Sequence, residues 1–105
     1  MEVIMYKILL CCTSGLTTSM LVNAMKKVAN ERSLDVMIWN VAASAIGLSW
    51  ADADCILIGP QNIGELEKVK LVVKTSIPVS IINETDFLKM DGEAVLDQAI
   101  KLIEK

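Results

Sequence analysis

Histidine is absent from this sequence of 105 residues. Without an imidazole the chain cannot build a Cys–His or Ser–His nucleophile pair, nor a metal site that depends on histidine ligands. Cysteine is scarce as well, and its three copies, Cys11, Cys12 and Cys55, have no CxxC spacing, so neither a zinc site nor a disulfide framework is favoured. Aromatic residues make up only 4% of the chain, and we expect Trp39 and Trp50 to pack in the interior. We therefore expect no metal ion and no other cofactor.

Long apolar runs are also missing, although 53% of the residues are hydrophobic and the mean hydropathy is +0.50. The longest stretches, residues 8–12 and 55–58, fall far short of the roughly 18 residues that span a bilayer. Glu2 is acidic and no basic cluster precedes the first run, so we expect no signal sequence, no membrane insertion and a cytoplasmic protein. A net charge of −3 with scattered Lys and Arg argues against a nucleic-acid partner.

Short apolar runs alternate with stretches of helical spacing along the chain. Strands are expected at residues 6–11, 35–40, 55–58 and 78–82, and helices at 18–30, 42–48, 63–74 and from Asp91 onward, with Asp91 as an N-cap. The helix at 63–74 should turn Ile63, Leu66, Val69 and Val73 toward the core. A chain of this length holds one hydrophobic core, so we expect residues 1–105 to form a single α/β domain.

This alternation predicts a parallel sheet with helices on both faces. Right-handed crossovers then favour a four-stranded, flavodoxin-like sheet of order 2-1-3-4. Ligands of such sheets bind beyond the carboxyl ends of the strands, where the winding direction reverses. The loop after Cys11 and the turn Gly59-Pro60-Gln61 should therefore face each other.

The loop after the first strand is the strongest candidate for chemistry. It consists of Cys12, Thr13, Ser14, Gly15, Leu16, Thr17, Thr18 and Ser19. Gly15 permits a positive φ, and successive N–H groups at the start of a helix form a cradle for an anion. Its hydroxyl groups are donors to such an anion, although the same residues are typical of ordinary N-caps and turns.

Cys12 is the expected nucleophile of this loop. The amides that hold an oxyanion also stabilise a thiolate, so we expect the pKa of the Cys12 thiol to fall below its ordinary value. Side chains alternate along a strand, which separates Cys12 from Cys11. Cys11 and Cys55 are interpreted as core residues, and the alternative for Cys12 is the same role at the end of the strand.

The evidence for a functional role is weaker for residues outside this loop. Gln61 follows the third strand, where its amide has the reach to join the cradle, but a solvated residue at a helix start fits equally well. The six methionines fit helix faces and gaps in the core. Asp52 and Asp54 precede a strand at the opposite end of the sheet, and we assign them no function.

Three motifs in order carry a family resemblance over nearly the whole chain: residues 12–22, residues 56–61 and Lys89-Met90-Asp91-Gly92. With them the sequence resembles enzyme IIB of the lactose/cellobiose class of the bacterial phosphoenolpyruvate-dependent sugar phosphotransferase system. The resemblance implies that Cys12 accepts a phosphoryl group from a histidine of enzyme IIA. It further implies transfer to a sugar, of the disaccharide kind, held by the membrane protein enzyme IIC. A monomer is expected, since the carrier must expose its site to two partners.

Three other interpretations of the function remain open at this point. The loop of a low-molecular-weight tyrosine phosphatase has an arginine at the position of Thr18, and without that bidentate clamp we expect negligible phosphatase activity. Residues 13–17 also resemble the phosphate loop of flavodoxins, but residues 83–87 offer little for a flavin sandwich. A module that senses an anion is the third reading.

Overall fold

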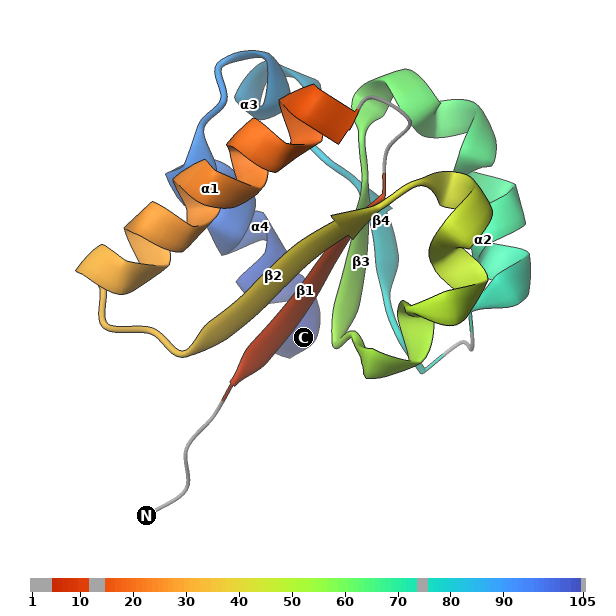
Figure 1. Ribbon diagram of the computed structural model, residues 1–105, viewed down its shortest axis with the longest axis horizontal. Helices are drawn as coiled ribbons and strands as arrows, with labels where there is room; N and C mark the ends of the chain where they lie inside the picture. Colours follow the sequence, from red (N-terminus) through yellow and green to blue (C-terminus); the bar gives the residue numbers. More distant parts are fainter. Residues whose placement is uncertain (1–4, 12–14, 74–75, 105) are drawn as a thin grey trace.

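The computed structural model describes residues 5–11, 15–73 and 76–104 and shows a four-stranded sheet between two helical layers (Figure 1). The strands are β1 (Tyr6–Cys11), β2 (Val36–Val41), β3 (Cys55–Ile58) and β4 (Val79–Ile81). Their order is β2-β1-β3-β4 and every pairing is parallel, which confirms the predicted flavodoxin-like sheet. The predicted bounds of the first and third strands are confirmed, and those of the second and fourth differ by one residue at each end.

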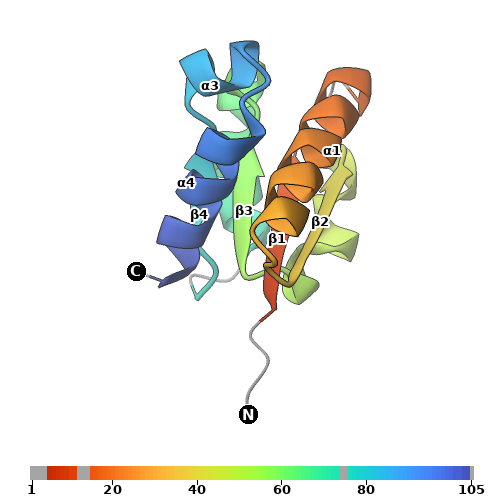
Figure 2. The same cartoon turned by 90° about the vertical axis from the view of Figure 1, so that its left-hand side faces the viewer.

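The described residues also form four α-helices and three short 3₁₀ segments, of which α3 and α4 follow the last strand and the others connect the strands. The α-helices are α1 (Gly15–Glu31), α2 (Leu66–Val72), α3 (Glu84–Leu88) and α4 (Gly92–Glu104), and the 3₁₀ segments are η1 (Ala43–Leu48), η2 (Trp50–Asp52) and η3 (Pro60–Glu65). Figure 2 shows α1 and α4 side by side on one face of the sheet. Within the described part of the chain, none of the helices has the length and apolar character that a membrane crossing requires.

The alternation of side chains along β1 divides the core into two halves. Ile8 and Leu10 pack with α1, α3 and α4 on one face, whereas Leu9 and Cys11 pack with η1 and α2 on the other. All four side chains are fully buried, as expected for a central strand of a parallel sheet. The assignment of Cys11 to the core is thereby confirmed.

The helix predicted at residues 63–74 is wrong at its first three residues. Residues 60–65 form η3, with a kink at Asn62, and the α-helix begins only at Leu66. A 3₁₀ segment has three residues per turn, so the phase of the apolar positions changes at the junction. Val69 and Val73 are buried as predicted, but Ile63 is 65% exposed.

Three further expectations need correction. Helix α1 begins at Gly15, three residues before the predicted start at Thr18. The helix expected at residues 42–48 is the 3₁₀ segment η1, and α3 was not predicted at all. Only some methionines fill the core: Met25 is fully buried, but exposed side chains include Met5, Met20 and Met37. Trp39 and Trp50 pack against the second half of the core, as expected.

The start of α4 shows why this helix begins where it does. The backbone N–H of Ala94 donates a hydrogen bond of 3.1 Å to the Asp91 carboxylate, which confirms Asp91 as the N-cap. Gly92 follows, and a Cβ atom there would lie 2.6 Å from the carbonyl carbon and oxygen of Ala24 in α1. The two helices therefore approach each other closely at this point, and only glycine fits.

Candidate functional site

The carboxyl ends of β1 and β3 lie next to each other at the upper edge of the sheet in Figure 1. Cys11 pairs with Ile58 in the parallel register, and the N–H of Gly59 donates a 3.0 Å hydrogen bond to the Cys11 carbonyl. This bond extends the hydrogen-bond ladder between β1 and β3 by one residue beyond the end of β3. The end of β1 therefore lies beside the turn at Gly59, whereas the first residues of the loop that was predicted to face this turn, Cys12 to Ser14, lie outside the described residues.

The candidate loop is described only in part. Cys12, Thr13 and Ser14 lie outside the described residues, and for Gly15, Leu16 and Thr17 the structure describes the backbone alone. Gly15 to Ser19 form the first turns of α1, where the positive end of the helix dipole is located and where the first N–H groups of a helix have no acceptor within the helix itself. The first turn of α1 contains no acidic residue, so no carboxylate in it competes for these groups.

Two hydroxyl residues of the loop have different environments. Thr18 is 1% exposed and belongs to the interior, whereas Ser19 is exposed. Thr18 thus occupies the position of the phosphatase arginine with a small, buried side chain.

The turn after β3 lies at the same edge of the sheet. Gln61 lies in η3 and is exposed. Its neighbour Asn62 is only 9% exposed, and the backbone N–H of Asn62 donates a hydrogen bond of 2.9 Å to the Gly59 carbonyl. Sequence reasoning singled out Gln61 and missed Asn62. A polar residue four positions after a buried strand, within a 3₁₀ turn that begins with Pro60, was the available signal.

Helix α3 lies at this same end of the sheet and is held at its N-terminal end. Asn83 caps it by accepting the Asp86 N–H at 3.1 Å. Gln98 of α4 donates its amide to the Ile81 carbonyl at 2.8 Å and accepts the N–H of Asn83 at 3.2 Å. Sequence reasoning missed these residues. An Asn before acidic residues is a typical helix start, and it could have revealed α3.

The described cysteines are unsuited to nucleophilic chemistry. Cys11 and Cys55 are free thiols with no exposed surface. Burial raises the pKa of the Cys55 thiol to about 12, and the nearby Asp54 carboxylate adds to the increase. At neutral pH the Cys55 thiol is therefore protonated and inert.

The opposite end of the sheet has a different character. Asp54 ties β1 to β3 there, because its carboxylate accepts the Lys7 N–H at 2.9 Å and its own N–H donates to the Lys7 carbonyl at 2.7 Å. This structural role agrees with the absence of an assigned function for Asp54. Within the described ranges, no group of histidine, cysteine or acidic residues is arranged to hold a metal ion.

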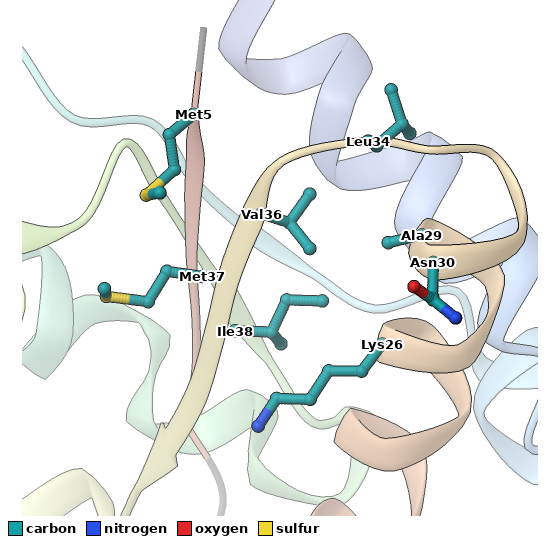
Figure 3. Close-up of a pocket in the computed structure, with 8 residues that line it drawn as sticks. All are labelled: Met5, Lys26, Ala29, Asn30, Leu34, Val36, Met37 and Ile38. Carbon is teal, nitrogen blue, oxygen red and sulfur yellow. The ribbon is translucent and has the colours of Figure 1, made fainter. Parts of the chain in front are cut away.

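A surface cavity of about 360 Å³ lies between the second half of α1 and the edge strand β2 (Figure 3). Its lining is mainly apolar, with Lys26 and Asn30 as its polar members among Met5, Ala29, Leu34, Val36, Met37 and Ile38. None of these residues belongs to the candidate loop or to the turn after β3. The cavity is therefore separate from the candidate site.

Comparisons with known proteins all identify the same family. A family model described as "PTS system, Lactose/Cellobiose specific IIB subunit" matches residues 7–98. The chain is 35% identical over 100 residues to the "PTS system oligo-beta-mannoside-specific EIIB component" of Bacillus subtilis, covering 94% of this chain and 97% of that protein. It is 32% identical over 104 residues to the "PTS system galactose-specific EIIB component" of Lactococcus lactis subsp. cremoris, covering 91% and 94%.

A solved structure is also similar. The cellobiose-specific phosphotransferase IIB component protein from Borrelia burgdorferi matches with a TM-score of 0.80 and 32% identity, covering 95% of this chain and 93% of that one. The similarity therefore extends through the sheet, both helical layers and the edge that holds the candidate loop.

Proposed function

Because this chain belongs to the lactose/cellobiose-specific IIB family of the sugar phosphotransferase system, we propose that Cys12 is its phosphoryl carrier. The donor is a phosphohistidine of enzyme IIA, and the acceptor is a sugar bound by the membrane protein enzyme IIC. The chain has no histidine of its own, so the donor imidazole comes from another protein. The reaction is a phosphotransfer between proteins followed by transfer to a sugar.

The single observation that supports this proposal best is the hydrogen bond between the Gly59 N–H and the Cys11 carbonyl. It fixes the end of β1 against the turn after β3, at the edge where ligands of such sheets bind. Cys12 is the next residue after Cys11, and α1 begins three residues later at Gly15. Along the sequence, Cys12 therefore lies between a fixed strand end and the start of a helix, which supports its proposed role.

The other two thiols support the choice of Cys12 by their burial. Cys11 and Cys55 have no exposed surface, and neither can approach a phosphohistidine of a second protein without unfolding of the core. Cys12 is the remaining cysteine of the three.

The proposed step is in-line attack of the Cys12 thiolate on the donor's phosphorus. A sulfur–phosphorus bond forms while the phosphorus–nitrogen bond breaks, and the departing imidazole nitrogen keeps the electron pair of that bond. N–H groups at the start of α1 are proposed to bind the phosphoryl oxygens, because this chemistry depends on positioning and electrostatics. Thr13, Ser14, Thr17 and Ser19 are proposed as hydroxyl donors, and Gln61 as an outer contact.

We further propose that residues 1–105 act as one monomeric carrier domain in the cytoplasm, because the site must meet two partners in turn. The relatives are named for an oligo-β-mannoside, galactose and cellobiose. This range fits a division of labour in which the sugar is selected by enzyme IIC, with a disaccharide as the proposed substrate class.

Phosphoryl incorporation from phosphorylated enzyme IIA tests the proposal. Wild-type protein and Cys11→Ser should incorporate one phosphoryl group, and Cys12→Ser should incorporate none. Incorporation by Cys12→Ser, together with its loss in Cys11→Ser, would show that the wrong cysteine was chosen.

A further inference from the structure

Helix α1, whose start carries the N–H groups of the proposed site, is positioned by two kinds of contact. Its Leu21 and Met25 side chains are fully buried and pack with Ile8 and Leu10 of the sheet. Apolar contacts of this kind are non-directional, so they fix the height of the helix above the sheet but oppose a sideways movement only weakly. Helix α4 lies beside α1, as Figure 2 shows, and its contact with α1 at Gly92 sets the sideways position.

The contact at Gly92 joins backbone to backbone. A Cβ atom on Gly92 would lie 2.6 Å from the carbonyl carbon and oxygen of Ala24 and 2.8 Å from the nitrogen of Met25. The peptide units of the two helices therefore meet with no side chain between them. A side chain can rotate to relieve an overlap, but a helical backbone cannot, so this contact defines how closely α1 approaches α4.

Helix α4 is the fixed partner in this contact. Its Gln98 side chain donates a hydrogen bond of 2.8 Å to the Ile81 carbonyl and accepts the Asn83 N–H at 3.2 Å. These two bonds tie α4 to the end of β4, and Asp91 caps its first turn. A side chain at position 92 therefore displaces α1 from its place on the sheet.

The far end of α1 is also tied to α4, so that a displacement grows toward its start. Arg32, directly after the helix, forms ion pairs with Glu93 at 3.2 Å and with Asp97 at 2.7 Å. Ala24 lies about 12 Å from Arg32 along the helix axis, and Gly15 lies about 25 Å from it, at 1.5 Å per residue. A separation on the order of 1 Å at Ala24 therefore becomes about 2 Å at Gly15.

We propose that Gly92 is a positioning residue for phosphoryl transfer, because its missing side chain lets α4 hold the start of α1 in register with the phosphoryl group on Cys12. This inference rests on the proposed function and adds to it a residue of a different helix, which acts through α1. Transfer depends on geometry, and a misplacement of about 1 Å can lower the rate of a reaction about a hundredfold.

The test compares Gly92→Ala with Val69→Ala as a control for lost stability. Val69 is 1% exposed and packs in the half of the core on the other face of the sheet, so shortening it weakens the fold without changing the contact between α1 and α4. Initial rates of phosphoryl incorporation are measured at increasing concentrations of phosphorylated enzyme IIA. In Gly92→Ala kcat should fall about ten- to a hundredfold with KM unchanged, whereas Val69→Ala should match the wild type.

Alkylation by iodoacetamide gives a second readout that needs no partner protein. Cys11 and Cys55 have no exposed surface, so the reagent reports on Cys12 in the folded protein. A displaced α1 stabilises the Cys12 thiolate less through its dipole. The alkylation rate of Gly92→Ala at about pH 7 should therefore be about two- to fivefold below that of the wild type. At about pH 10, where the thiol is ionised in both proteins, the two rates should agree.

Wild-type behaviour of folded Gly92→Ala in either readout, or equal losses in Val69→Ala, would overturn the positioning role and leave the carrier function intact. A wild-type protein that accepts no phosphoryl group from the donor would overturn the carrier function itself, and alkylation would still show whether Gly92 acts on Cys12. Circular dichroism verifies that each variant is folded. A variant that is not folded in buffer is measured, together with the wild type, in concentrated sucrose, which favours the compact state.

Discussion

Replacing Gly92 by alanine is a sharp test of how α1 and α4 are packed. A Cβ atom at this position would lie 2.6 Å from the carbonyl carbon and oxygen of Ala24 and 2.8 Å from the nitrogen of Met25. Ordinary contacts between non-bonded carbon atoms are about 3.5–4.0 Å. The atoms in the way belong to the backbone, so no side-chain rotation relieves the overlap. The two helices must move apart by a distance on the order of 1 Å.

The expected magnitude follows from the cost of overpacking. Inserting one methyl group into a close-packed contact destabilises a protein by about 1–3 kcal/mol. Each kcal/mol lowers Tm by roughly 4–8 °C in a domain of about this size. We therefore expect Gly92→Ala to reduce Tm by about 4 to 24 °C.

Thermal and urea unfolding measure this effect, with Gly64→Ala as the matched control. A Cβ atom at Gly64 meets no other atom within 4 Å, and no described glycine has a positive φ. The control should unfold like the wild type or gain about 0.4–1 kcal/mol through a less flexible unfolded chain. If Gly92→Ala unfolded at the same temperature as Gly64→Ala, the close approach of α1 and α4 would be refuted.

Three further predictions concern stability and specificity. Because the folded pKa of Cys55 is about 12 against an ordinary 9.0, the unfolded chain loses this proton first, and stability falls as pH rises through that window. Above pH 9, urea titrations should show that the free energy of unfolding of the wild type falls by up to about 1.4 kcal/mol per pH unit more than that of Cys55→Ala. Equal slopes of this free energy against pH in the two proteins would contradict the buried thiol. Gln98→Leu removes the bonds to Ile81 and Asn83 and should lower the free energy of unfolding by about 1–2 kcal/mol, measured in urea; an unchanged midpoint would mean that α3 is held by other contacts. Hydrolysis of an aryl phosphate should be negligible, because Thr18 is buried and supplies no guanidinium; measurable turnover would reverse this conclusion.

The strands and their order could be predicted because the signal is local and strong. Residues 8–11 and 55–58 are continuous apolar runs. Such runs are typical of strands in a sheet that is covered on both faces. Topological rules then leave few arrangements, and the order 2-1-3-4 is confirmed. The meeting of Cys11 and Gly59 follows directly from that order, so this part of the candidate site was predictable as well.

The errors arise where tertiary structure overrides periodicity. Ile63 precedes Leu66 by three residues, as on one face of a helix, but it lies in the 3₁₀ segment η3 and is exposed. Helix α3 is too short for a periodic pattern and depends on Phe87 in the core and on Gln98 of α4, which is distant in sequence. Contacts of this kind cannot be inferred from composition or spacing.

The measurement that tests the central claim most directly is the mass of a variant that keeps Cys12 as its only cysteine. In Cys11→Ala combined with Cys55→Ala, both changed side chains are buried core residues, so the double variant is first verified to be folded by circular dichroism. After incubation with phosphorylated enzyme IIA, mass spectrometry should show one added phosphoryl group on the peptide that contains Cys12. A folded double variant that remains unmodified while the wild type is phosphorylated would contradict the assignment of Cys12 as the phosphoryl carrier.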